Sequence, residues 1–240
     1  MQKRTKIITA SIVGAVLVLG ATAAIAGPII YRDVIVGEAD AAPSVTAVPS
    51  PSTPATAEAG AGSDVASDLS GAWAVADGSY AGYRVDEVLN GTDVTVVGRT
   101  DEVTGTLSVD GLTLDAAEIT VDVASIATDN GSRDDYFRDS AMRVDENPTA
   151  TFVLTEAVVS GEEPAVGEVQ TIQATGDLTL AGVTRSVTVE LEAVLNGETG
   201  QVAGSIPITF ADFGVEAPNL GFVSVEPEGF VEFSLELERA

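Results

Sequence analysis

The sequence has no cysteine and no histidine. Without cysteine there can be no disulfide bond, no thiolate metal site and no lipid anchor on an N-terminal cysteine. Without histidine there can be no Ser-His-Asp or Cys-His catalytic set, no histidine general base and no ordinary zinc site. Only carboxylate or tyrosine chemistry remains for an enzyme, so we expect a protein that is not an enzyme and that needs neither a metal nor a cofactor.

Positive charge is also scarce. The chain has 11 lysines and arginines against 37 aspartates and glutamates, a formal net charge of -26. Lys3, Arg4 and Lys6 lie at the N-terminus, and no lysine follows Lys6. Because so acidic a surface repels phosphate groups, we expect no nucleic-acid partner and no direct docking on an anionic membrane.

A long apolar run follows this basic start (residues 1–6). The segment from Ile7 to Ile30 has no charged residue and is long enough to span a bilayer, and Tyr31 suits the interface. We therefore predict a transmembrane anchor over residues 7–31, with the N-terminus in the cytosol and the C-terminal part outside the cell membrane. Cleavage after Ala26 as a signal peptide is the alternative, and it would release a secreted protein.

Residues 32–69 are dominated by Ala, Pro, Ser, Thr and Gly. Such a segment has too little apolar surface to offset its ordering entropy, so we predict a disordered linker. From residue 70 to residue 240 the pattern changes to short strands, which indicates one folded domain.

Apolar and polar residues alternate along many stretches of this domain. Clear examples run from Ile119 to Val123, from Val187 to Ala193 and from Val231 to Leu237. Alternation with one polar face is typical of antiparallel strands that are solvated on one side. Hairpin turns are expected at Asn90-Gly91, Asp110-Gly111, Ala181-Gly182 and Asn196-Gly197. These patterns alone allow either a closed barrel or a sandwich.

Three segments carry a more specific pattern. Ser125–Arg138 runs from a strand end through a polar turn into a short charged helix, and Asn147–Phe152 starts a new strand after Pro148. Gly176–Val187 forms a strand, a turn and the next strand. Together these segments resemble the YceI-like family of lipid-binding β-barrels, over residues 70–240. The junction from Gly27 to Ala41 is similar to that of membrane-anchored actinobacterial members.

The resemblance implies an all-β fold: an extended antiparallel, eight-stranded, lipocalin-like barrel with a short helical insertion near residues 132–142. It implies an extracytoplasmic protein that holds an isoprenoid or other long-chain lipid in the barrel lumen. A homodimer is also compatible with the sequence.

The candidate lipid-binding residues are those expected to point into the lumen or to lie under its cover. They are Tyr83, Phe137, Met142, Phe152, Leu178, Leu180, Val189, Leu191, Ile206, Ile208, Phe210, Phe213, Phe222 and Phe233. The resemblance places Arg133 and Asp134 in the cover segment, where Arg133 either pairs with a carboxylate or contacts the ligand.

Two rival functions stay open from the sequence. The barrel could be filled by its own side chains, as in a structural or stress-response surface domain, or it could be a carboxylate-based hydrolase. Two departures from the family bear on the ligand. Many relatives have a histidine in the region of Tyr83 to Val97, and many have an aromatic residue at the position of Asn147. We expect these departures to change ligand contacts and not the fold.

Overall fold

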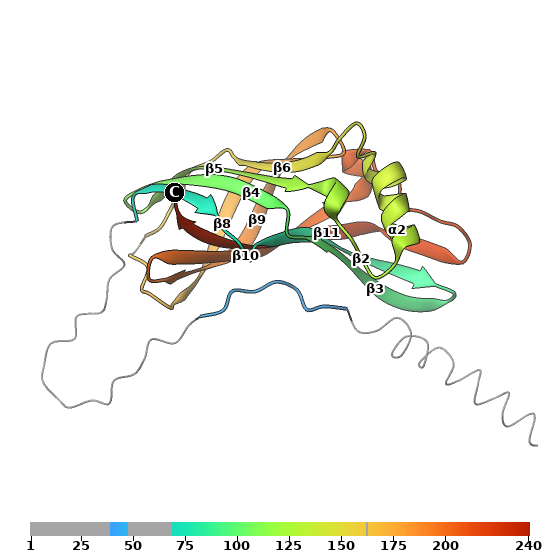
Figure 1. Cartoon of the computed structure of the whole chain (residues 1–240), viewed down its shortest axis with the longest axis horizontal. Helices are drawn as coiled ribbons and strands as arrows, with labels where there is room; N and C mark the ends of the chain where they lie inside the picture. Colours follow the sequence, from blue (N-terminus) through green and yellow to red (C-terminus); the bar gives the residue numbers. More distant parts are fainter. Residues whose placement is uncertain (1–38, 48–68, 162) are drawn as a thin grey trace, which may run out of the picture.

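The computed structural model describes residues 39–47, 69–161 and 163–240. The folded part is an antiparallel β-barrel with a short helical segment beside it (Figure 1). Within these ranges no helix is both long and apolar enough to cross a membrane. The anchor predicted over residues 7–31 and the alternative cleavage after Ala26 lie outside the described residues, so both stay predictions.

Strands that are neighbours in space form a closed ring. In ring order they are β1 (Gly71–Val75), β4 (Val103–Asp110), β5 (Thr113–Asp122), β6 (Thr149–Leu154), β8 (Val169–Leu180), β9 (Val183–Asn196), β10 (Thr199–Thr209) and β11 (Val223–Arg239). The ring closes because β1 pairs with β4 on one side and with the end of β11 on the other. This confirms the predicted all-β class and the eight-stranded antiparallel barrel.

A hairpin extends one wall beyond the ring. It consists of β2 (Tyr80–Leu89) and β3 (Thr92–Thr100), and β2 pairs with the first half of β11. The register of β11 against β2 shifts between Val225 and Gly229. The short β7 (Val158–Val159) pairs with β5 on another side. The barrel wall is therefore longest where β11 and the β2–β3 hairpin run together.

The predicted hairpin turns are confirmed. Asn90 and Gly91 join β2 to β3 with φ of 52° and 79°, and Ala181 and Gly182 join β8 to β9 with φ of 48° and 78°. Two successive residues with positive φ give a turn whose twist matches that of paired strands. Asparagine and glycine tolerate this conformation well, whereas alanine at position 181 accepts some strain.

The helical segment follows β5 and the short η2 (Val123–Ser125). It has two parts, α2 (Gly131–Tyr136) and the π-helix η3 (Phe137–Met142). The side chain of Asn130 caps α2 by accepting hydrogen bonds from the backbone N–H groups of Ser132 and Arg133. The helix ends at Arg143, whose φ of 50° is left-handed, so the segment matches the helical insertion expected near residues 132–142.

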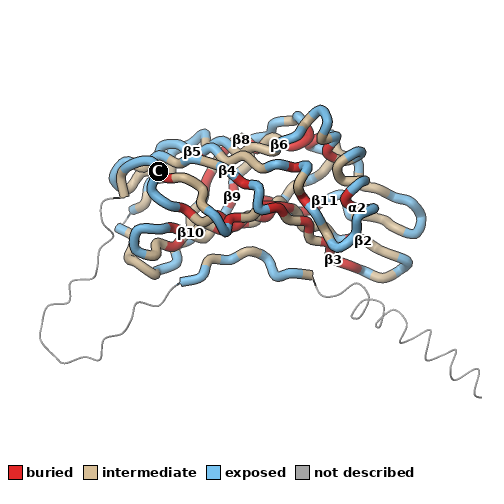
Figure 2. Tube along the Cα trace, in the orientation of Figure 1, coloured by how far each residue is buried: buried red, intermediate tan, exposed pale blue. Residues whose placement is uncertain are grey.

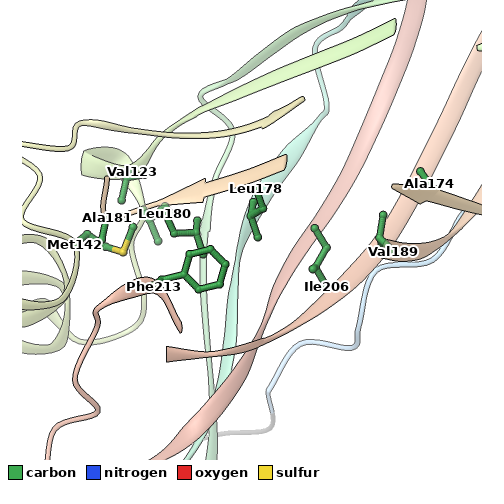
Figure 3. Close-up of a cluster of buried hydrophobic side chains, with 10 residues drawn as sticks. Val123, Met142, Ala174, Leu178, Leu180, Ala181, Val189, Ile206 and Phe213 are labelled. Carbon is green, nitrogen blue, oxygen red and sulfur yellow. The ribbon is translucent and has the colours of Figure 1, made fainter. Parts of the chain in front are cut away.

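Inward-facing residues of the strands form the main core. Val189 is 2% exposed and Leu178 is 3% exposed, and both belong to one core cluster with Ile206 and Phe213 (Figure 3). A second cluster surrounds Trp73 near the ring closure. Buried positions are concentrated along the strands in the middle of the molecule (Figure 2). The alternation in the sequence therefore identified the inward faces of β8, β9 and β11 correctly.

The outer face of β11 departs from the predicted pattern. Glu232 and Ser234 were expected on a solvated face, but they are only 1% and 5% exposed. Arg84 on β2 covers Glu232, with its Nε atom 2.6 Å from one carboxylate oxygen and its Nη2 atom 3.3 Å from the other. The ion pair allows a carboxylate to be buried on the outside of the barrel.

Residues 39–47, which we call the strap, lie across this outer face (blue in Figure 1). At one end Asp40 pairs with Arg99 of β3 at 3.0 Å, and its carbonyl accepts a hydrogen bond from Arg84. At the other end the backbone N–H groups of Val45 and Thr46 donate to side chains of β9 and β10. The prediction of a disordered linker therefore does not hold for the strap.

Candidate functional site

The barrel encloses two adjoining apolar chambers. The larger has a volume of about 640 Å³ and lies inside the ring, and the smaller has about 440 Å³ and lies toward the β2–β3 hairpin and the helical segment. Ala81, Val121, Ala150, Leu180 and Val231 line both, so the chambers meet at these residues. Each volume falls within the roughly 300–1,000 Å³ typical of ligand pockets.

Two glycines make room for aromatic rings on the paired strands of the barrel wall. Gly98 lies across from Tyr83, and Gly204 lies across from Phe233. A β-carbon at Gly98 would approach the Tyr83 ring to 2.6 Å, and one at Gly204 would approach the Phe233 ring to 2.8 Å. Because glycine has no side chain, each ring can lie against the neighbouring strand. The ring then takes up less of the lumen.

The structure brings all the predicted lumen residues to one or both chambers. The larger chamber is lined by Phe152, Leu178, Leu180, Val189, Leu191, Ile206 and Phe233. The smaller chamber is lined by Tyr83, Phe137, Met142, Leu180, Ile208, Phe210, Phe213 and Phe222. Phe222 differs from the others because it is 58% exposed and lies at the rim. Contact of these side chains with a lipid stays a prediction.

The helical segment forms one wall of the smaller chamber. Arg133 and Tyr136 of α2 and Phe137 and Met142 of η3 line it. The Phe137 ring stacks on Tyr83 of β2, with ring centroids 4.8 Å apart and planes at 22°. This stack fixes the helical segment against the barrel wall, so the π-helix is positioned as part of the chamber.

Arg133 is held by carboxylates on both sides. Its Nη1 atom is 2.7 Å from Asp129, and its Nη2 atom is 3.2 Å from Glu87 of β2. Burial alone would lower the pKa of Arg133, but the neighbouring Glu87 and Asp129 outweigh this and raise it. The sequence left two roles open for Arg133, pairing with a carboxylate or contact with the ligand. The structure shows pairing with carboxylates.

Asp134 does not point into either chamber. It is 8% exposed and accepts hydrogen bonds from the backbone N–H of Thr128 at 2.9 Å and from the Thr128 hydroxyl at 2.7 Å. Asp134 therefore fixes the loop before α2 and is not a direct ligand contact in this geometry.

Glu87 is a site residue that the sequence analysis missed. Glu87 points inward, is 5% exposed and lines the smaller chamber. The sequence contained a sign of this position. Glu87 is an even number of residues from Ala81, Tyr83 and Val85 on the same strand, so its side chain points to the same face.

Tyr83 supplies a phenol at the smaller chamber. Burial raises its pKa above the ordinary value of 10.0, with nearby carboxylates adding to the effect and Arg133 opposing it. The phenol therefore stays neutral in the folded protein at pH values where an exposed tyrosine ionises.

This shift predicts a loss of stability at alkaline pH. Above about pH 10 the unfolded chain releases the Tyr83 proton while the folded chain keeps it, so the free energy of unfolding falls by up to about 1.4 kcal/mol per pH unit. Tyr83→Phe should remove that component. Denaturant unfolding of both proteins between about pH 8 and about pH 11 measures it. Tyr80→Phe, on the outer face of β2, is the matched control, and a constant difference between wild type and Tyr83→Phe would contradict the prediction.

Comparisons with known proteins agree with this architecture. The model of the YceI-like domain family matches residues 73–237. A UPF0312 protein of Pseudomonas aeruginosa (strain LESB58) is 31% identical over 121 residues, which cover 48% of this chain and 59% of the relative. Protein YceI of Escherichia coli O157:H7 is 32% identical over 85 residues, covering 35% of this chain and 40% of the relative. The matches thus span 59% and 40% of the length of these two relatives, less than two thirds of each.

Solved structures show the same fold. A polyisoprenoid binding domain from Saccharophagus degradans, described as implicated in plant cell wall breakdown, is 22% identical with a TM-score of 0.58; the match covers 70% of this chain and 98% of that one. Burkholderia cenocepacia BcnA is 24% identical with a TM-score of 0.51, covering 64% and 95%. At this identity the likeness concerns the fold. With the family model covering residues 73–237, the chain belongs to the YceI-like domain family.

Proposed function

We propose that this protein binds an isoprenoid or similar long-chain lipid in its two chambers, outside the cytoplasm and without catalysis. The observation that carries the proposal is the pair of adjoining apolar chambers, with volumes of about 640 and 440 Å³ and five lining residues in common. Burying about ten methylenes contributes about 8 kcal/mol before entropic losses, which corresponds to a micromolar dissociation constant. The polyisoprenoid binding domain with the same fold supports this ligand class.

The charges around the lumen favour a lipid with an uncharged head group. Among the described residues, Glu87, Arg133 and Glu216 line the smaller chamber and Glu168 lines the larger one. Arg133 is already paired with Glu87 and Asp129, so it does not present a free cation. A phosphate carries about −1.5 to −2 charges near pH 7, and it would meet carboxylates at either chamber. An alcohol or quinone head avoids this repulsion.

The test is to extract the purified protein with organic solvent and to identify the lipids by mass spectrometry. We expect a long-chain isoprenoid with a neutral head. The stripped protein should then bind a long-chain prenol more tightly than the same prenol esterified to phosphate. No lipid in the extract and no uptake of the prenol would overturn the proposed function and favour a barrel without a ligand. Equal binding of prenol and prenyl phosphate would overturn the head-group assignment alone.

A further inference from the structure

Large apolar side chains are exposed at the rim of one chamber. Leu220, Phe222 and Phe230 are 59%, 58% and 40% exposed, and all three line the smaller chamber. The other exposed large apolar side chains among the described residues are valines, and of these only Val159 lines the larger chamber. The rim formed by Leu220, Phe222 and Phe230, which we call the apolar rim, therefore distinguishes the two ends of the lumen.

The apolar rim is held in place by backbone hydrogen bonds. The Asn90 N–H at the tip of the β2–β3 hairpin donates to the Phe222 carbonyl at 2.8 Å, and the Leu220 N–H donates to the Val223 carbonyl at 2.8 Å. Val225 also donates to the carbonyl of Pro218 at 3.1 Å. The exposure of Leu220 and Phe222 is therefore a property of an ordered loop, and such exposed apolar groups beside a pocket mark an interaction surface.

Charge restricts the partner of this surface. The nearby acids include Glu216, which lines the chamber, and Glu226 and Glu228 in the irregular part of β11. Arg84 pairs with Glu232 and Arg133 with Glu87. The exposed Arg185, which shares a surface pocket with Phe230, Glu226 and Glu228, donates a hydrogen bond to the Thr184 carbonyl. The three acids Glu216, Glu226 and Glu228 outnumber Arg185 near the apolar rim, so this surface repels an anionic bilayer and suits one with no net charge.

The strap limits which end of the barrel can reach a membrane. If residues 7–31 span the bilayer as predicted, seven residues separate Tyr31 from Ala39, and the eight Cα–Cα steps between them reach at most about 29 Å. Asp40 is bound to Arg99 and Arg84 on the β3 and β2 strands, the hairpin whose tip supports the apolar rim (Figure 1). A strand of 17 residues such as β11 is roughly 56 Å long. The segment between Tyr31 and Ala39 is thus too short for both ends of the barrel to reach the membrane equally well.

We propose that the apolar rim is the port through which lipid passes between an uncharged or zwitterionic bilayer and the smaller chamber. The inference rests on the proposed function for its cargo, but it also predicts a contact that can be measured without any ligand. Phe222 and Leu220 would insert among the lipid tails next to the mouth, so an isoprenoid could move from bilayer to lumen without crossing water.

Because the chain has no cysteine, single cysteines can report which end contacts the bilayer. The full chain carrying Leu220→Cys or Val159→Cys is labelled with a fluorophore and reconstituted into phosphatidylcholine vesicles that contain spin-labelled lipids. We expect quenching of the label at position 220 and none at position 159. Quenching at position 159 equal to or stronger than at position 220, or none at either, would overturn the port.

A second measurement follows transfer of a fluorescent long-chain prenol from the same vesicles into the barrel. Leu220→Ser with Phe222→Ser should slow transfer by roughly tenfold, as expected for losing the burial of part of two large apolar side chains. Val153→Ser, at an exposed valine that lines neither chamber, is the matched control and should leave the rate unchanged. Equal rates in the rim variant and the control would overturn the port, whereas no uptake by any protein, including the wild type, would overturn the proposed function itself.

Discussion

Replacing Leu191 with aspartate is expected to empty the lumen or unfold the barrel. Leu191 lies on β9, faces inward and lines the larger chamber. An unpaired carboxylate in apolar surroundings loses its hydration without gaining a partner, which costs several kcal/mol. We therefore expect either a large fall in the unfolding midpoint or a folded protein that no longer carries lipid. Thermal unfolding and mass spectrometry of the organic extract distinguish these outcomes.

Two milder variants of the same strand sharpen this test. Glu190→Gln changes the neighbouring side chain, which is exposed on the outer face, and should alter neither stability nor lipid content. Leu191→Ala should cost less than the roughly 2–5 kcal/mol typical of a tightly packed leucine, because its side chain borders an open chamber. A full packing penalty for Leu191→Ala, together with no lipid in the wild-type extract, would favour a lumen filled by side chains.

The strands could be predicted because one face of most of them is mainly apolar. Val189 and Leu235 follow strict alternation, and both are buried. Alternation does not reveal how strands close, so the sequence allowed a barrel or a sandwich. The closure depends on β1 pairing with the end of β11, where Trp73 lies opposite Arg239. That pairing joins residues far apart in the chain, and no local pattern encodes it; the family resemblance supplied it.

Polar residues in the site were harder to predict than apolar ones. The lumen residues could be named because any inward apolar side chain lines the cavity of an open barrel. Glu87 and Glu232 were missed, since burial of a carboxylate depends on a partner from another element, Arg133 for the first and Arg84 for the second. The strap was missed for a similar reason. Its composition indicates disorder, and its position depends on Asp40 meeting Arg99.

The pair Arg84–Glu232 leads to the second large expected effect. Arg84→Met would leave the Glu232 carboxylate, 1% exposed, without its cation on the outer face of β11. The hydroxyl of Ser205, 3.5 Å from Glu232, is then the remaining side-chain contact described for it. Removing one partner of a buried ion pair typically costs about 3–5 kcal/mol, because the other charge stays buried and unpaired. Denaturant unfolding should show this loss, accompanied by release of the strap, whose Asp40 carbonyl also accepts from Arg84.

The double variant Arg84→Met, Glu232→Leu separates the cost of an orphaned charge from the value of the pair. Replacing both partners with apolar side chains of similar size is often neutral or stabilising, so the double variant should recover most of the stability that Arg84→Met loses. Arg138→Met is the matched control, because Arg138 pairs with the exposed Asp135, and such surface pairs contribute about 0–1 kcal/mol. If the double variant were as unstable as Arg84→Met, the loss would come from packing of the arginine side chain, and the buried charge would not be its cause.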